Sequence, residues 1–498
     1  MSSTVERLLA SHGRGFGRRQ FLALAAVTPL AIAEVVHAAG ADDPVETLVA
    51  DFVRRGNVDG LSVAVIRDGQ THFYNAGVIS RETRAPASEL SVYEIGSISK
   101  TFTGLLLAHA ITEGRTAASD DVRHYLPPGY DNLVRDGRPV QLIDLVNTTS
   151  ALPDNLPDWR TAVVDAKPAD IPFIAAELIN GSTPQSLMAE LRTASLVDTP
   201  GAMPRHSNVA SQVAGIVLER LYDRPYEALL ARYIEQPFGM ASGAAASPPH
   251  LVQGYDPGGP AMPALTAPVV RPAGALRYST SDMARYIAAQ LAVRDPAIAL
   301  THQPAWGTVD ADAIGFHWMI RKTADSQIYM RHSGGTFGFS AYCEFYPSEG
   351  YGIVLLGNRA GAQDTLGSLA NAAHDALFGK PRGLVALEAA LEQTRYADIG
   401  ASVADTRSRF PELFLSESAV NSWGYRLMRA ERPTEGTAMF AYNVAEHPES
   451  WNVHDCYAEA LAAAGQKVQA IAHYRRSLAL NPSNDNASTM IAQLSAQN

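Results

Sequence analysis

Ser97 and Lys100 are the side chains of this 498-residue chain whose types and spacing best fit nucleophilic catalysis. A serine hydroxyl has too high a pKa to be a nucleophile unaided. At the start of a predicted helix, Ser97 would lie at the positive end of the helix dipole, beside free backbone N–H groups. Lys100, three residues later, would lie on the same face one turn on. If Lys100 is buried, loss of solvation disfavours its charged form, so that it can accept the serine proton.

Taken alone, this S-x-x-K motif is weak, because a helix with a serine cap and a surface lysine explains it as well. Two further segments carry polar residues that can complete such a site. The dipeptide PG at 200–201 precedes HSN at 206–208, which leads into a predicted helix. The tetrapeptide HSGG at 332–335 leads into a strand-rich segment.

The order and spacing of the three motifs resemble those of the serine β-lactamase and penicillin-binding protein family. The resemblance covers about residues 43–380. It is closest to the branch of class C β-lactamases, D-Ala-D-Ala carboxypeptidases and family VIII esterases. Short sequence segments outside the three motifs also match the family: DGQ at 68–70, LP at 126–127, TTSALP at 148–153, GM at 239–240 and STSD at 279–282.

The resemblance implies a role for each motif. Ser97 matches the nucleophile and Lys100 its proton-shuttling partner. Asn208 matches the side chain that bonds the substrate amide and steadies the lysine. The backbone N–H groups of Ser97 and Gly335 would form the oxyanion hole, which stabilises the charge that develops during acyl transfer. The strand edge that hydrogen-bonds the substrate backbone is matched by His332, Ser333, Gly334 and Gly335.

Two residues depart from the family pattern. His206 stands where the family usually has a tyrosine that acts as a general base. A neutral histidine also accepts protons near neutral pH, so we expect His206 to act as a base; the alternative is a spacer in a weakened enzyme. His332 stands where class C β-lactamases carry lysine. A histidine at this position resembles DD-peptidases and many esterases of this group. A cation that recognises a carboxylate is thereby lost or made pH-dependent, which disfavours an efficient β-lactamase.

The elements that must position these residues are predicted from hydrophobic patterning. Leu61–Ile66 and His72–Val78 flank a turn and predict a β-hairpin. Apolar residues at helical spacing predict a helix over Ser97–Thr112. Glu344–Tyr346 and Tyr351–Leu356 predict two more strands. Helices in the middle and strands at both ends indicate an α+β domain with one antiparallel sheet from the terminal segments beside an all-helical region. The resemblance implies a β-lactamase/transpeptidase-like fold.

The tail, residues 421–498, shows a 34-residue repeat. Phe440 and Tyr474 are separated by this interval, and so are Pro448 and Pro482. A helix–turn–helix period of this length resembles tetratricopeptide repeats, and a small all-α tail follows from it. An ordinary helical extension is the alternative. Residues 381–420 are a connecting helical segment. The repeats offer a surface for a protein partner or for self-association.

The amino terminus, residues 1–39, has the pattern of an export signal. Residues 18–22 read RRQFL, the twin-arginine pattern, and an apolar stretch follows to Ala33. Small residues at 36–38 suit a signal peptidase. The apolar run is shorter than the ~20 residues that a spanning helix needs. We therefore expect an exported protein, periplasmic or secreted, with no stable membrane span after cleavage. The alternatives are an uncleaved anchor and a cytosolic chain.

Composition argues against several other functions. The formal net charge is −11, and no long Lys/Arg run follows residue 20, so nucleic acid is a poor partner. The two cysteines, Cys343 and Cys456, lie in different predicted domains and are expected to be buried, unpaired thiols. A disulfide between them in an oxidising compartment is the alternative. No Cys/His cluster has metal-ligand spacing, and no P-loop, G-x-G-x-x-G or G-x-S-x-G motif occurs. We expect neither a metal nor an organic cofactor.

The sequence therefore predicts a serine hydrolase that acts through an acyl-enzyme. The resemblance implies that its substrates are D-Ala-D-Ala-type peptides or the β-lactams that mimic them. One alternative is a promiscuous short-chain carboxylesterase. Another is a catalytically weak penicillin-binding or scaffold protein. Specificity depends on loops around residues 150–200 and 240–275, whose shapes the pattern does not define.

Overall fold

The computed structural model describes residues 35–37, 43–241, 250–482 and 484–496. Apart from residues 35–37, the predicted export signal lies outside the described residues. Residues Ala33–Asn498 form one compact unit. Among the described residues, no helix combines the length and apolar character that crossing a bilayer requires.

The centre of the fold is an eight-stranded sheet, with strand order β1-β3-β2-β12-β11-β10-β9-β8. Its strands are β1 (Val35–His37), β2 (Gly60–Arg67), β3 (Gln70–Gly77), β8 (Ala313–Gly315), β9 (Trp318–Lys322), β10 (Ile328–Gly335), β11 (Ser340–Tyr346) and β12 (Tyr351–Gly357). All neighbours are antiparallel except β1 and β3. The predicted hairpin is β2–β3, and the predicted strand pair is β11–β12. Because β2 pairs with β12, strands from both ends of the domain share one sheet, as predicted.

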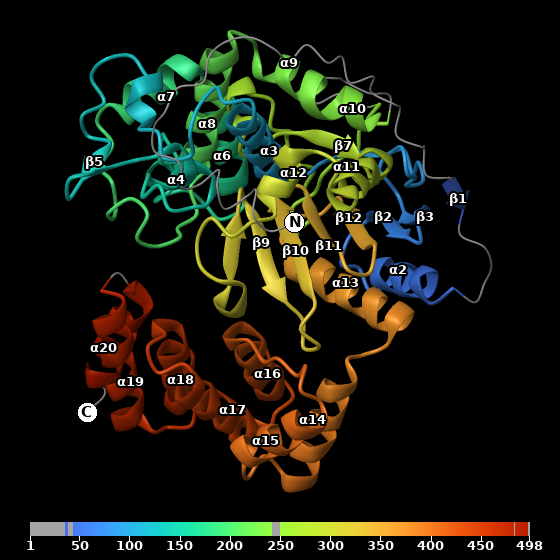
Figure 1. Ribbon diagram of the computed structural model, residues 1–498, viewed down its shortest axis with the longest axis vertical. Coiled ribbons are helices and arrows are strands. Elements are labelled where there is room, and N and C mark those ends of the chain that lie inside the picture. The colour runs from blue at the N-terminus through green and yellow to red at the C-terminus, as the bar shows by residue number, and fades with distance from the viewer. Residues whose placement is uncertain (1–34, 38–42, 242–249, 483, 497–498) are drawn as a thin grey trace, which may run out of the picture. The chain divides into compact units, whose positions relative to one another are not determined.

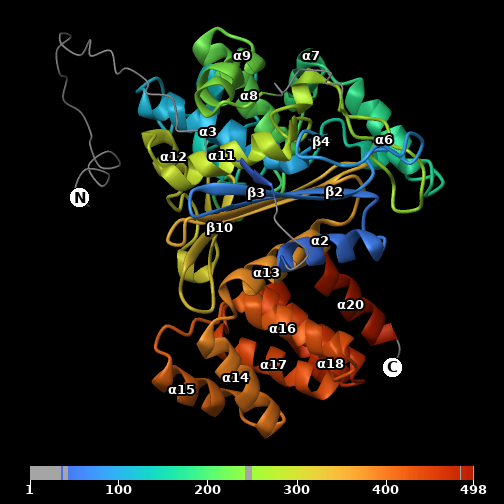
Figure 2. The ribbon, with the colours of Figure 1, turned by 90° about the vertical axis from the view of Figure 1, so that its right-hand side faces the viewer.

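Helices cover both faces of this sheet (Figures 1 and 2). One face packs against α2 (Pro44–Arg54) and α13 (Gln363–Phe378), and the other faces the helical region. The helical region contains α3 (Ser99–Thr112), α4 (Leu142–Val146), α5 (Trp159–Ala162), α6 (Ile171–Asn180), α7 (Pro184–Leu191), α8 (Asn208–Tyr222), α9 (Tyr226–Leu230), α10 (Gln236–Phe238), α11 (Thr280–Ala292) and α12 (Pro296–Thr301). Two short ribbons lie outside the sheet, β4 (Val92–Glu94) with β7 (Arg277–Ser279) and β5 (Val134–Arg135) with β6 (Arg138–Pro139). The predicted α+β class is confirmed.

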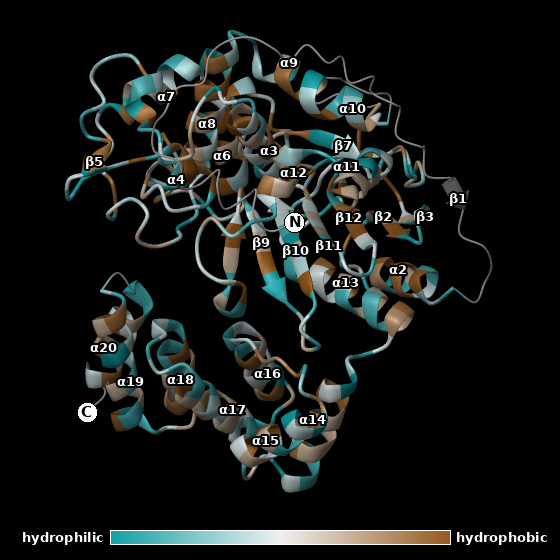
Figure 3. Ribbon diagram, viewed as in Figure 1, coloured by the Kyte–Doolittle hydropathy of each residue, from teal (hydrophilic) through white to brown (hydrophobic). Residues whose placement is uncertain are grey.

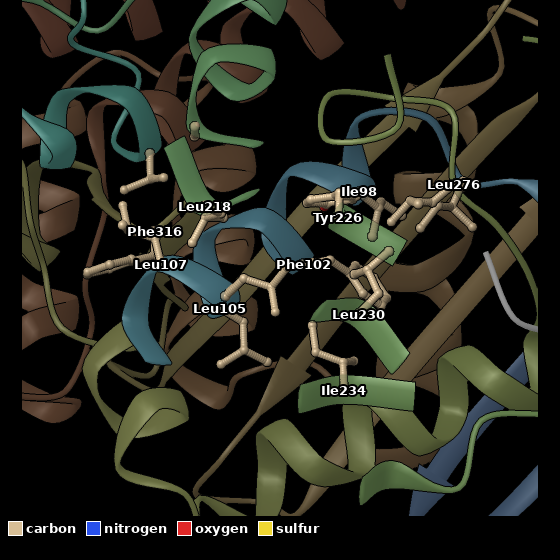
Figure 4. Close-up of a cluster of buried hydrophobic side chains, with 14 of the residues drawn as sticks. Ile98, Phe102, Leu105, Leu107, Leu218, Tyr226, Leu230, Ile234, Leu276 and Phe316 are labelled. Atoms are coloured by element: carbon tan, nitrogen blue, oxygen red, sulfur yellow. The ribbon is translucent and has the colours of Figure 1, made fainter. Parts of the chain in front are cut away.

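Helix α3 is buried on all sides, from Ser99 to Ala110. A helix with such a sequence belongs in a core rather than at a surface. Phe102 stacks on Tyr278 and Tyr286 at ring-centroid distances of 5.1 and 4.0 Å. Leu105 and Leu107 project from the same helix into a cluster of apolar side chains (Figure 4). This packing fixes α3 in place and carries its lysine into the interior.

The tail is made of helices throughout. They are α14 (Arg382–Thr394), α15 (Ile399–Arg409), α16 (Glu417–Arg429), α17 (Pro433–Glu446), α18 (Trp451–Ala463), α19 (Lys467–Leu480) and α20 (Asp485–Ala496). Helices α18 and α19 begin 34 residues after α16 and α17, respectively. Apolar and polar residues alternate around these helices (Figure 3), as expected of helices that pack on one side. A Cβ at Gly424 would lie 2.7 Å from the Phe440 ring, which explains the small residue there. The tetratricopeptide-like assignment stays a prediction.

Candidate active site

Ser97 lies in a 3₁₀ turn, Gly96–Ile98, between strand β4 and helix α3. The α-helix itself begins at Ser99, two residues later than predicted. Gly96 has a φ of +54°, a region that glycine enters without steric cost. A Cβ there would lie 2.4 Å from the backbone nitrogen of Gly335. The turn that carries the serine is therefore packed directly against strand β10.

Lys100 is buried and makes three hydrogen bonds. Its Nζ lies 2.9 Å from Ser97 Oγ, 2.8 Å from Asn208 Oδ1 and 2.8 Å from the carbonyl oxygen of Ala273. Burial lowers the pKa of Lys100 to about 7, opposed by the carboxylate of Asp154. A sizeable fraction of the amine is therefore neutral at physiological pH. The helix spacing seen in the sequence thus produces a buried serine–lysine contact.

Asn208 is the first residue of α8, and the hydroxyl of Ser207 caps this helix. Asn208 Oδ1 accepts from the lysine, and its Nδ2 donates to Asn155 Oδ1 at 2.9 Å. The two bonds fix the orientation of this amide. Asn155 was not found from the sequence, since nothing in its spacing marks it.

The four residues from His332 to Gly335 form the end of β10. This strand pairs with β11 from Met330 to Gly335 on one side, but on the other side β9 pairs with it only as far as Arg331. The last four residues therefore have one edge that β9 leaves open. A Cβ at Gly334 would lie 3.0 Å from the Ser97 nitrogen, so the serine turn approaches this same edge. The structure thus brings Ser97, Lys100, Asn208 and the strand edge together.

His332 is buried, and its Nδ1 lies 2.7 Å from the carbonyl oxygen of Ser333. Burial, reinforced by the charge of Lys100, lowers its pKa to about 3. A second histidine, His317, is also buried, and burial, followed by the charges of His332 and Lys100, lowers its pKa well below the usual range. Both imidazoles are neutral at physiological pH. Of the two outcomes expected for His332, loss of the cation is the one that this geometry favours.

His206 has an exposed side chain and a carboxylate partner. Its Nδ1 lies 2.6 Å from Asp154 Oδ1, and Asp154 Oδ2 accepts from Arg160 at 2.7 Å. Partial burial alone would raise the pKa of Asp154, but the hydrogen bonds and charges of His206 and Arg160 hold it at about 2. Asp154 directly follows the TTSALP phrase, but sequence spacing gives no sign of its pairing with a residue 52 positions away.

Two cavities meet at Ser97. One of about 430 Å³ is lined by Asn208, Asn155, Trp159 and Phe337. The other, of about 740 Å³, is lined by Lys100, His332 and Ser333. Residues that line both cavities are Ser97, His206, Gly335 and Gln363. No group of His, Cys, Asp and Glu residues suited to a metal ion occurs in the part of the chain that the structure describes.

Comparison with known proteins agrees with this fold. The family model described as Beta-lactamase matches residues 45–377. A Pseudomonas fluorescens protein named Beta-lactamase is 25% identical over 367 residues, which cover 63% of this chain and 92% of that protein. A β-lactamase/D-alanine carboxypeptidase structure from Pseudomonas syringae has a TM-score of 0.57 at 21% identity and covers 68% of this chain and 99% of its own. A class C β-lactamase structure has a TM-score of 0.58 at 21% identity, with 70% and 100% covered. At this identity the two structures support the fold alone.

Proposed function

The chain belongs to the beta-lactamase family and is a serine hydrolase, and we propose that it acts through an acyl-enzyme on Ser97, with D-Ala-D-Ala-type peptides or β-lactams as substrates. The observation that carries the proposal is the buried contact of 2.9 Å between Lys100 Nζ and Ser97 Oγ. The site offers a nucleophile, a base of suitable pKa and an open strand edge within one cleft.

The hydrogen bonds of Lys100 set the direction of the first proton transfer. A neutral amine has two N–H donors and one lone pair. Asn208 Oδ1 and the Ala273 carbonyl oxygen can only accept, so they take the two donors. The lone pair is then left for the hydroxyl proton of Ser97. Asn208 therefore orients the base as well as lining the cleft.

The next step is attack of Ser97 Oγ on the substrate carbonyl. The backbone N–H groups of Ser97 and Gly335 belong to two segments that touch at Gly96, where a Cβ would meet Gly335 at 2.4 Å. Two donors on facing segments suit an oxyanion, and removing one such donor costs about 10²–10³ in rate in other enzymes. The C–N or C–O bond then breaks, and the leaving group takes a proton.

We infer that His206 serves as the base in deacylation. When its Nδ1–H is donated to Asp154, the Nε2 lone pair is left to accept a proton from water. His206 lines both cavities that contain Ser97. Asp154 thus acts as a positioning residue that selects the tautomer. This arrangement supports turnover and disfavours the alternative of a mere spacer.

The neutral His332 favours peptides over β-lactams. The burial that keeps this imidazole uncharged removes the cation that class C β-lactamases have at this position. The proposed activity is therefore closer to that of a DD-peptidase, with ester hydrolysis as the second candidate. The twin-arginine pattern at residues 18–22 supports an exported enzyme.

Intact-protein mass spectrometry after exposure to benzylpenicillin tests the proposal, with Ser97→Ala as the control. We expect an adduct of the unaltered protein on Ser97 and none on the variant. A lasting adduct favours a peptidase, and rapid loss with ring-opened product favours a β-lactamase. Release of D-alanine from diacetyl-L-Lys-D-Ala-D-Ala, compared with cleavage of p-nitrophenyl butyrate, separates peptidase from esterase. The absence of both adduct and hydrolysis, or equal hydrolysis by Ser97→Ala, would refute the proposal.

A further inference from the structure

The two cavities at Ser97 are lined by different residues of the candidate active site. Lys100, which takes the serine proton and must return one to the departing amine, lines only the larger cavity. Asn208, which can bond the amide of the acyl part, lines only the smaller cavity. The larger cavity is therefore the one into which the leaving group projects.

This leaving-group cavity has a volume of about 740 Å³. Small-molecule sites range from about 300 to 1,000 Å³, so this cavity can hold far more than one alanine. Its walls include the aromatic rings of Trp306 and Trp451 beside polar groups such as Asn452. A surface with both apolar and hydrogen-bonding parts suits a peptide.

One wall of the cavity comes from the helical tail. Glu417 begins α16, and Trp451 and Asn452 begin α18; all three line the cavity together with Ser97. Asn452 Nδ2 donates to Glu417 Oε1 at 3.0 Å, which links the first turns of the two helices. The tail therefore contributes side chains to the same cleft as the nucleophile.

Contacts with the β9–β10 turn hold the start of α16 at this position. Phe414 donates its backbone N–H to Ala324 at 2.9 Å, and Ser326 Oγ donates to the Glu412 carbonyl oxygen at 2.7 Å. Lys322 lies 4.6 Å from the centre of the Phe414 ring. Strand β10 continues from this turn to Ser333 and Gly334, so one hairpin connects the tail to the strand edge of the site.

We propose that the leaving group is a peptide amine of more than one residue and that Trp451 and Asn452 of the tail bind it. The proposal rests on the proposed function. In the reaction, the bond between Ser97 Oγ and the carbonyl carbon forms and the C–N bond breaks. The amine takes the proton passed through Lys100 and leaves from the cavity beside α18. The tail is thus a specificity element for cleavage within a peptide.

The test varies the leaving group at a constant acyl part. The substrates are N-acetyl-D-alanyl peptides whose leaving amine contains one, two or three alanine residues, with p-nitrophenyl butyrate as a small reference. The full-length protein is compared with Trp451→Ala and Trp451→Phe. Tyr457→Ala is the matched control, because it removes a ring of the same helix that packs against His473, 4.7 Å away, rather than lining the cavity. Circular dichroism checks that each variant is folded.

For the unaltered protein, kcat/KM is expected to rise with the length of the leaving peptide. Trp451→Ala should abolish this rise, with a loss of about tenfold on the longest substrate, and leave p-nitrophenyl butyrate within about twofold. Trp451→Phe should recover part of the loss, and Tyr457→Ala should retain the rise. No length dependence, or an equal loss on every substrate, would overturn the inference. If the proposed function itself is wrong, the unaltered protein forms no adduct on Ser97, which is a separate outcome.

Discussion

Replacement of Lys100 by methionine should change how the stability of the protein depends on pH. The lysine has a pKa of about 7 in the folded state and an ordinary value of 10.5 when exposed. Between these values the unfolded chain binds a proton that the folded chain does not. Stability therefore rises with pH across this window, because the penalty for burying the amine disappears as the unfolded state also loses its proton.

The size of the effect follows from the two pKa values. Burial of this lysine costs the folded state about 5 kcal/mol at pH 7 and below, at about 1.4 kcal/mol per pKa unit. Between pH 7.5 and 9.5, the free energy of unfolding of the unaltered protein should rise by roughly 2 to 3 kcal/mol relative to Lys100→Met. The hydrogen bonds lost in the variant change its stability equally at both pH values, so they do not affect the change of the stability difference with pH.

Urea unfolding of the two proteins, followed by tryptophan fluorescence at several pH values, measures this difference. Lys167→Met, at an exposed lysine outside the cleft, is the control. The difference in unfolding free energy between this variant and the unaltered protein should not change with pH. If the stability difference between Lys100→Met and the unaltered protein is also independent of pH, the lysine keeps its proton in the folded state, and the argument for a neutral base fails. The same ionisation should appear in the acylation rate, which is expected to rise with pH and level off above about pH 7.

Two further predictions concern the surroundings of this base. Gly96→Ala should lower the acylation rate at least about a hundredfold, because the new Cβ would meet the backbone of β10 at 2.4 Å. Gly114→Ala is the control, since Gly114 has a φ of +68° but open space around it. Equal losses in the two variants would contradict the packing argument. Asp154→Asn should move the acidic limb of the pH–rate profile of acylation to lower pH, since the Asp154 carboxylate raises the pKa of Lys100. Asp158→Asn in the same loop should leave this limb unchanged. An upward shift, or no shift, in Asp154→Asn would refute this effect of Asp154 on Lys100.

The serine–lysine contact is the part of the site that the sequence predicts best, since helical spacing alone places two residues three apart on one face. The strands β2, β3, β11 and β12 were also predicted, because their apolar runs end at clear turns. The resemblance also indicates Asn208 as a partner of Lys100, but the backbone partner could not be predicted. The Ala273 carbonyl lies 173 residues away in sequence, and a backbone acceptor has no side-chain signature.

The tail shows a similar limit. Its 34-residue interval is visible in the sequence, and the helices begin at that interval. The contacts that join the tail to the β9–β10 turn, such as the hydrogen bond from Phe414 to Ala324, involve residues with no marked pattern. Periodicity predicts how a repeat is built, whereas single contacts decide where it docks.

Burial explains why the two histidines that depart from the family pattern behave differently. His332 is enclosed without a carboxylate partner and stays neutral, whereas His206 is exposed and bonded to Asp154. The arginines that line the cavities are each within 4 Å of an aspartate, as the pairs Arg160–Asp154, Arg205–Asp198 and Arg321–Asp312. With these cations already paired, recognition of a free carboxylate has little electrostatic support, and the strand edge and cavity walls must supply specificity. A leaving peptide that continues past the first residue has no carboxylate there, so this charge pattern agrees with a long leaving group bound beside the tail.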